Sequence, residues 1–154
     1  MNFQKLFSII SLSIIFNAVC IPQVHAQKNM KPVIIGYVGV YNGNIIDPFT
    51  IDASRLSHIN YAFADIKENR AWLHNEKTDT VNFRNLNTLK KINPDLKIMI
   101  SVGGWTWSKH FSEAVSTETS TQDFAQSAVD IVAGYDLDGV DIDWEYPGMK
   151  GDGN

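Results

Sequence analysis

The sequence predicts an α/β fold with a parallel sheet, and two observations support this fold class. Short apolar segments rich in β-branched residues recur along the chain and are typical of buried strands. Two segments with apolar residues at helical spacing, at 83–92 and about 120–133, alternate with the later strands. Such alternation indicates βα repeats, in which helices cover a mostly parallel sheet.

The first third of the chain is predicted to hold two strands. Residues 33–38 read as a first buried strand, followed by a loop over 40–49 that contains Asn-Gly-Asn and Asp-Pro turn signals. A short helix is possible within 51–56, and the second strand is expected at 58–66. The polar segment 67–82 is predicted to be a loop, with a hairpin possible.

The middle of the chain predicts a helix and then a strand. Apolar residues at steps of three, namely Phe83, Leu86, Leu89 and Ile92, form a helical stripe. Pro94 ends this helix, because proline disfavours helix at the residue before it. The run from 96 to 102 is apolar nearly throughout, as expected for a parallel strand covered on both faces.

A second helix is predicted before the last strand. Thr119, Ser120 or Thr121 provides a candidate N-cap, and the helix is expected to run to about Ala133. Gly134 is a suitable C-terminal stop. The face toward the sheet is predicted to consist of Phe124, Ala128, Ile131 and Val132.

The most informative segment is the predicted last strand, which reads DGVDIDWEYP from Asp138 to Pro147. Side chains alternate along a strand, so Asp141, Asp143 and Glu145 share one face. Residues two apart in this row lie about 6.5 Å from each other at the usual strand rise. Three carboxyl groups so close cannot all ionise without cost, and at least one pKa is predicted to rise. A carboxyl group that stays protonated near neutral pH can act as a general acid.

This acidic strand resembles the DxxDxDxE signature of family 18 glycoside hydrolases, the chitinases and their relatives. A second motif of that family, SxGGW, is matched by Ser101-Val102-Gly103-Gly104-Trp105. The resemblance extends over 33–147 and implies a (β/α)₈ barrel, of which this chain covers about the first four strands. Because the active site of such barrels lies at the C-terminal ends of the strands, Trp105, Glu145 and residues 63–65 are expected to converge.

The resemblance also implies roles for the acidic row. Glu145 is the expected general acid, and the nucleophile is the N-acetyl oxygen of the substrate rather than a second carboxylate. Asp143 would orient the acetamido group, and Asp141 would share a proton with Asp143. Asp138 is out of phase with the row, so a structural role at the strand entrance is expected.

Further residues are candidates for supporting or substrate-binding roles. Ser101 and Tyr37 are expected on strands next to the acidic row, within hydrogen-bonding reach of Asp141. Gly103 and Gly104 allow a tight turn after the third strand. Trp105 is a candidate for stacking on a sugar ring, with core packing as the alternative. The remaining two candidates border the site, at Phe63 and Tyr146.

Residues 1–26 read as a secretory signal with a charged start, an apolar stretch and a small-residue cleavage site at Ala26. A lipoprotein signal around Cys20 fits less well. We therefore expect a mature segment 27–154 in the periplasm or outside the cell, with no membrane association after the signal is removed. That segment lacks Lys5 and Cys20, so it retains 12 of the 13 basic residues, all 17 acidic ones and no cysteine.

This composition excludes some partners. A mildly acidic chain without basic clusters lacks the positively charged surface that binds nucleic acid. The mature segment has no cysteine, so it can form no disulfide. His58 and His74 show no ligand spacing with each other or with the acids, so no metal and no cofactor is expected.

The resemblance therefore implies a secreted chitinase that acts on chitin or N-acetylglucosamine oligosaccharides, monomeric when complete. The alternatives are an endo-β-N-acetylglucosaminidase acting on glycans, a non-catalytic chitin-binding protein, and an inactive remnant. A complete barrel needs about 250 residues, so we expect an N-terminal part of a longer enzyme that is inactive alone. A genuinely short product is the other possibility.

Overall fold

The structure is a computed structural model that describes residues 32–40 and 43–149 of the 154. The expected signal, residues 1–26, lies outside the described residues, as does the segment 150–154. Among the residues that are described, no helix is both long and apolar enough to cross a membrane.

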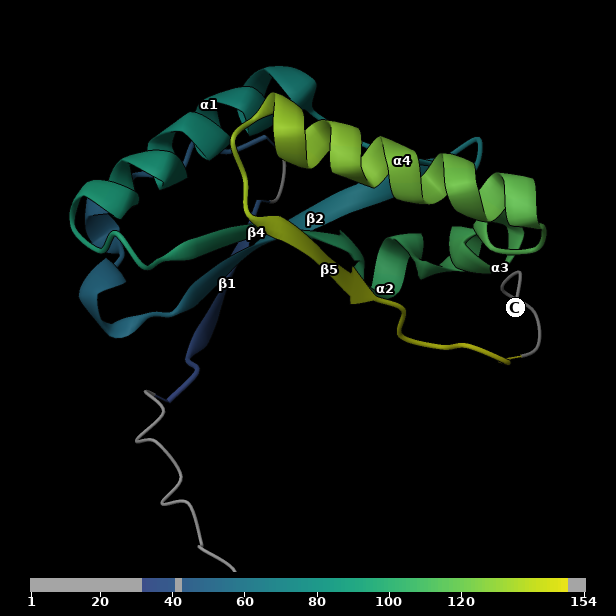
Figure 1. Cartoon of the computed structure of the whole chain (residues 1–154), viewed down its shortest axis with the longest axis horizontal. Helices are drawn as coiled ribbons and strands as arrows, with labels where there is room; N and C mark the ends of the chain where they lie inside the picture. Colours follow the sequence, from purple (N-terminus) through teal and green to yellow (C-terminus); the bar gives the residue numbers. More distant parts are fainter. Residues whose placement is uncertain (1–31, 41–42, 150–154) are drawn as a thin grey trace, which may run out of the picture. The chain divides into compact units, whose positions relative to one another are not determined.

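A parallel sheet of four strands forms the centre of the fold, as predicted (Figure 1). The strands are β1 (Ile35–Gly39), β2 (His58–Lys67), β4 (Lys97–Gly103) and β5 (Gly139–Asp143), and they lie in the order β1-β2-β4-β5. A short strand, β3 (Arg70–Trp72), pairs with the end of β2 in an antiparallel hairpin. The hairpin that the sequence allowed within 67–82 is therefore present.

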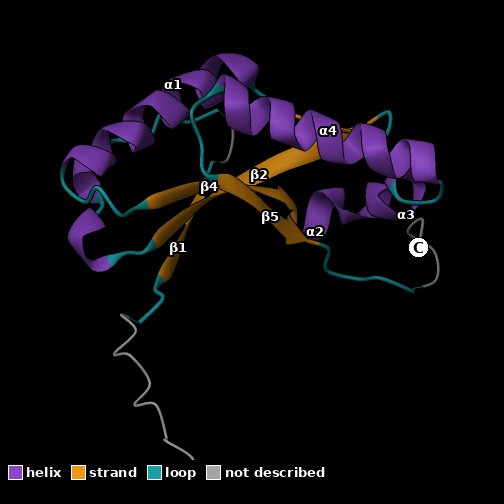
Figure 2. Cartoon of the chain, viewed as in Figure 1, coloured by secondary structure: helices purple, strands orange, loops and turns teal. Residues whose placement is uncertain are grey.

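Two long helices cover one face of the sheet. They are α1 (Glu76–Asn87) and α4 (Glu118–Gly134), and Figure 2 shows both lying over the same face. Two short helices, α2 (Gly104–Trp107) and α3 (Phe111–Ala114), follow β4. The 3₁₀ turns are Pro48–Thr50, Ala53–Arg55, Thr88–Lys91 and Ser108–His110.

The hydrophobic core lies between the sheet and the helices. From the sheet it contains the side chains of alternate strand residues, as the period of two requires: Ile59, Tyr61, Ile98, Ile100 and Val102. The helices contribute Phe83, Leu86, Phe111, Phe124 and Ala128. The predicted inner face of α4 is thus confirmed, with Ile131 and Val132 partly buried beside it.

The prediction that the first strand is buried is wrong. The strand begins at Ile35 rather than at residue 33, and Ile35 and Tyr37 are 50% and 56% exposed. Within the described residues β1 pairs only with β2, so it is an edge strand of this sheet. The sequence pattern identified the strand but could not reveal its place at an edge.

The predicted bounds of α1 are also wrong. The helix begins at Glu76 instead of residue 83 and ends at Asn87, and Ile92 is 59% exposed beyond it. Its first turns bury Asp79 and Asn82 where an apolar stripe would carry hydrophobic residues. Asp79 accepts a 2.6 Å hydrogen bond from Tyr61. Because the buried positions of these turns are polar, the helical spacing of apolar residues does not extend into them.

The ends of α4 differ from the prediction by a few residues. Thr117 is the N-cap, and it forms a capping box with Ser120. Gly134 belongs to the last turn of the helix, and the left-handed conformation after the helix is taken by Asp136, with φ of 55°. Asp and Asn tolerate this conformation better than most residues.

The acidic strand has its apolar side against the core, as expected for Val140 and Trp144. The intervening Ile142 is 53% exposed. The strand itself ends at Asp143. Asp141 and Asp143 are therefore strand residues, whereas Glu145 lies in the segment that leaves the sheet.

Candidate active site

The acidic row lies where β4 and β5 end side by side, with Gly103 opposite Asp143 in the ladder. Ser101 stands opposite Asp141 and donates a 2.7 Å hydrogen bond to its Oδ2 atom. The hydroxyl of Tyr37 donates to the same oxygen over 3.0 Å. Asp141 is thus held by two donors that come from two different strands.

The strand that carries Tyr37 is not the neighbour that the sequence suggested. Ser101 belongs to β4, the direct neighbour of β5, but Tyr37 belongs to β1 at the opposite edge of the four-stranded sheet. The tyrosine reaches Asp141 because it is long and because the sheet is curved at this point.

The predicted rise of a carboxyl pKa is found at Asp143. Burial raises the pKa of Asp143 above its usual value, and the negative charge of Asp141 raises it further. From the sequence, the crowding of carboxyl groups was the expected cause of the raised pKa. In the structure burial is the larger effect, because Asp143 lies half-buried at the end of the sheet.

Glu145 is exposed and lines a cavity of about 400 Å³. The strand ladder has ended before it, and a serine hydroxyl holds its backbone instead: the amide of Glu145 donates to Ser108 Oγ over 3.1 Å. Ser108 was not predicted as a site residue. No signal in the sequence separates it from other serines, because its role arises from tertiary contact.

Aromatic side chains line much of the cavity that contains Glu145. Its lining consists of Val40, Ala62, Phe63, Gly103, Trp105, Thr106, Trp107 and Glu145. Trp105 is 66% exposed, so this residue is not the core filler that was the alternative. Tyr146 packs edge-on against it at 5.2 Å between ring centroids and donates a 2.9 Å hydrogen bond to its carbonyl oxygen.

The two glycines before Trp105 are required by close packing. Gly103 and Gly104 have φ of 113° and 68°, which side chains rarely adopt. A Cβ atom on Gly103 would overlap the carbonyl oxygen of Asp143 and lie 2.7 Å from the Phe111 ring. A Cβ atom on Gly104 would lie 2.8 Å from the Phe63 ring. The turn therefore brings β4, β5 and Phe63 together.

Asp138 lies at the other end of β5, apart from the acidic row. Its Oδ2 atom accepts a 2.8 Å hydrogen bond from the amide of Ile98 and lies 2.8 Å from the Lys90 ammonium. Burial alone would raise the pKa of Asp138, but the hydrogen bonds from Lys90, Ile98 and Lys97 together lower it.

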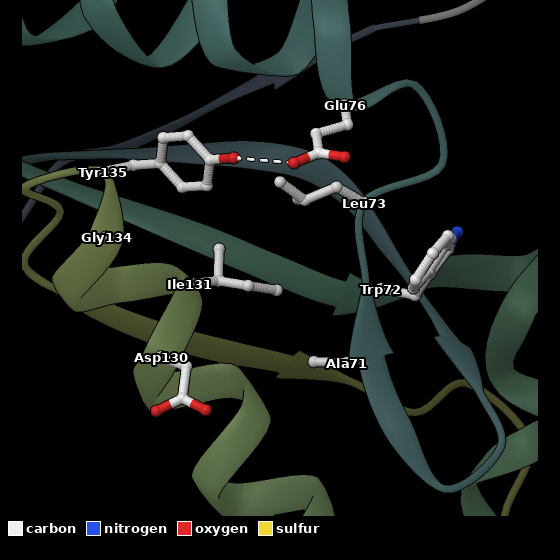
Figure 3. A pocket seen from close by; sticks show the side chains of 8 residues that line it. All are labelled: Ala71, Trp72, Leu73, Glu76, Asp130, Ile131, Gly134 and Tyr135. Carbon is white, nitrogen blue, oxygen red and sulfur yellow. Dashed lines mark hydrogen bonds between the residues drawn. The ribbon is translucent and has the colours of Figure 1, made fainter.

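A second cavity, of about 450 Å³, lies away from the acidic row, between β3, α1 and α4 (Figure 3). It contains Glu76 and Asp130 but none of the predicted site residues. Within residues 32–40 and 43–149, no group of three or more His, Cys, Asp or Glu residues is placed to hold a metal ion. The ring of His74 packs against Trp107, and His58 Nδ1 lies 2.9 Å from Ser57 Oγ.

Known proteins share the sequence pattern and the fold of this chain. The family model described as glycosyl hydrolases family 18 matches residues 33–154. Chitinase A1 of Niallia circulans is 36% identical over 194 aligned positions, which cover 93% of this chain and 27% of that protein. The chain spans about a fifth to a third of the length of the curated relatives it matches.

Two solved structures show the same fold. A group IV chitinase of Ostrinia furnacalis superposes with a TM-score of 0.70 at 30% identity, over 78% of this chain and 35% of the other. Human YKL-39, described as a pseudo-chitinase with retained chitooligosaccharide binding, gives a TM-score of 0.64 at 31% identity, over 75% and 33%. The four parallel strands thus correspond to part of a (β/α)₈ barrel. The chain belongs to glycosyl hydrolase family 18.

Proposed function

We propose that this chain carries the acid-bearing part of a chitinase active site, which hydrolyses β-1,4 bonds between N-acetylglucosamine units. The observation that carries the proposal is the position of Glu145 at an aromatic-lined cavity, on the same segment as Asp143 and as Asp141, which two hydrogen bonds orient. Exposed aromatic rings suit the apolar faces of sugars, and a carboxyl group at such a cavity can reach a glycosidic oxygen.

Glu145 protonates the glycosidic oxygen in this proposal. The N-acetyl oxygen of the substrate attacks the anomeric carbon and forms an oxazolinium-type intermediate, so the configuration is retained. Asp143 accepts the acetamido N–H and stabilises the positive charge that develops there. Its raised pKa and its proximity to Asp141 suit a pair that shares one proton.

Asp141 is the member of the pair that the protein fixes most firmly. Its Oδ2 atom accepts hydrogen bonds from both Ser101 and Tyr37. The raised pKa of Asp143 favours a proton on that residue. Trp105, with Trp107 and Phe63 beside it in the lining, is the proposed platform for a sugar on the leaving-group side.

A non-catalytic chitin-binding function is the second candidate, because a pseudo-chitinase is among the similar structures. Chitin-binding relatives without activity usually lack the acid at the position of Glu145, and this chain retains it. We therefore favour an enzyme. Export by the segment 1–26 remains part of the proposal and rests on sequence alone.

The proposal is tested in an exchange protein, in which residues 33–149 replace the matching segment of Niallia circulans chitinase A1. We expect this protein to cleave chitotetraose to shorter oligomers, detected by mass spectrometry, and the chain alone to bind without cleavage. Binding of chitotetraose without hydrolysis by a folded exchange protein would support the non-catalytic function instead. Cleavage by the chain alone would contradict its expected inactivity.

A further inference from the structure

Ser108 connects the turn after β4 to the backbone on both sides of Trp144. Its Oγ atom donates a 3.0 Å hydrogen bond to the carbonyl oxygen of Asp143 and accepts one of 3.1 Å from the amide of Glu145. We propose that Ser108 is a positioning residue, which sets the direction of the Glu145 side chain. This inference rests on the proposed role of Glu145 as the acid.

The Ser108 hydroxyl binds the backbone directly beyond the end of the β4–β5 ladder. The pairing of β4 with β5 ends at Gly103 and Asp143, so among the described residues this ladder does not extend to the segment that carries Glu145. A hydroxyl can donate one hydrogen bond and accept others, and Ser108 uses both abilities on this segment. Because Ser108 is fully buried, water cannot easily replace it.

The residues on either side of Glu145 are anchored as well. The Trp144 ring stacks on Phe111 at 5.2 Å between centroids and an interplanar angle of 18°. The Tyr146 hydroxyl donates to the carbonyl oxygen of Trp105. Glu145 is thus an exposed side chain on a fixed segment of backbone, and its direction depends on those neighbours more than on contacts of its own carboxyl group.

Loss of the Ser108 hydroxyl would leave a backbone amide and a carbonyl oxygen without this partner. The segment can then relax by a fraction of an ångström and carry the carboxyl group away from the glycosidic oxygen. A misplacement of about 1 Å at a reacting group costs on the order of 100-fold in rate. Binding of the sugar by the aromatic platform would change little.

The test compares Ser108→Ala with Ser127→Ala in the exchange protein. Ser127 is a matched control, because it is also buried and also joins two backbone groups: it accepts from the Ala71 amide and donates to the Phe124 carbonyl oxygen, both at 2.8 Å. It lies in α4, away from the acidic row. Glu145→Gln is measured in parallel as the test of the acid itself.

We expect both serine variants to lose similar thermal stability, but only Ser108→Ala to lose turnover, by roughly 10- to 100-fold in kcat with KM within about twofold. Equal kcat values in the two serine variants would overturn the positioning role. If Glu145→Gln kept full activity, the proposed function would fail instead, so the two failures are distinguishable. Should Ser108→Ala not fold, the exchange rate of the Glu145 amide hydrogen in the parent decides: fast exchange contradicts the inference, and protection supports it.

Discussion

Tyr37 donates a hydrogen bond to Asp141 although the two residues lie on opposite edge strands of the four-stranded parallel sheet. In a flat sheet the two edges would be three strand spacings apart, or about 14 Å. A tyrosine side chain cannot reach that far. The contact therefore requires a sheet curved with its acidic face inward, which is the curvature of a barrel wall.

The two donors to Asp141 are predicted to compensate in part for each other's loss. Both Tyr37 and Ser101 donate to the same oxygen, so Tyr37→Phe and Ser101→Ala should each lower kcat/KM of the exchange protein by roughly tenfold, the effect of about 1.4 kcal/mol. A double-mutant cycle measures the coupling, and we expect the double variant to lose more than the two single losses multiplied, because no donor then remains. Strictly multiplicative losses would contradict a shared acceptor.

Asp143 is predicted to reduce stability at neutral pH. Burial, and then the charge of Asp141, raise its pKa in the folded state. Between the unfolded pKa, about 3.9, and the folded one, the native state binds more protons, so stability falls as pH rises through that window. Asp143→Asn should therefore raise the melting temperature at pH 7, and this gain should disappear near pH 3. Through the proposed role of Asp143 toward the acetamido group, the same variant should lose hydrolysis.

The comparison of Asp143→Asn with the parent at two pH values can also contradict this prediction. If Asp143→Asn were destabilised equally at pH 7 and pH 3, the residue would contribute by packing or hydrogen bonding that does not depend on charge. Thermal unfolding of parent and variant in matched buffers at the two pH values separates these cases.

Gly103 is predicted to tolerate no side chain. Alanine there would combine an unfavourable positive φ with overlap against the Asp143 carbonyl oxygen and the Phe111 ring. We expect Gly103→Ala to lose more than about 2 kcal/mol of stability and most activity. Gly134→Ala is the control: it is helical with no atom within 4 Å of its added Cβ, and should be neutral or more stable by up to about 1 kcal/mol. Urea unfolding of both variants checks this, and equal effects would be the contrary result.

Asp138 is predicted to stabilise the fold rather than the reaction. Asp138→Ala removes the acceptor of the buried Ile98 amide and should cost about 1–3 kcal/mol at pH 7. Because the folded pKa is lowered, this contribution is present above the unfolded pKa and is lost as pH falls through the folded one. Asp130→Ala, which breaks an exposed pair with Arg70, should cost less than about 1 kcal/mol. A large loss of kcat in Asp138→Ala at unchanged stability would contradict the structural role.

The sequence predicted the strands better than the helices. The run 96–102 is apolar nearly throughout and 58–66 is rich in apolar residues, so both strands can be predicted without tertiary information. The start of α1 could not be predicted because Asp79 and Asn82 are polar but buried. Their hydrogen-bond partners, Tyr61 and the carbonyl oxygen of Asn44, are remote in sequence. The edge position of β1 likewise depends on pairing, which the local pattern does not contain.

For the site, the motif identified the acidic row, and alternation along a strand placed Asp141 and Asp143 on one face. It did not reveal that Glu145 leaves the strand, or that Ser108 holds it. The position of Glu145 and its contact with Ser108 depend on the turn after β4, whose short helices α2 and α3 are too short to show a periodic pattern. Composition does not single out Ser108 either, since serine is common in loops.

The most direct test of the central claim uses two substrates with different leaving groups. In the exchange protein, Glu145→Gln should reduce kcat on chitotetraose by about 10²- to 10⁴-fold, the usual contribution of a general acid. On an aryl chitobioside whose phenol leaves without protonation, the loss should be far smaller. Equal losses on both substrates, or full activity on chitotetraose, would contradict the assignment of Glu145 as the acid.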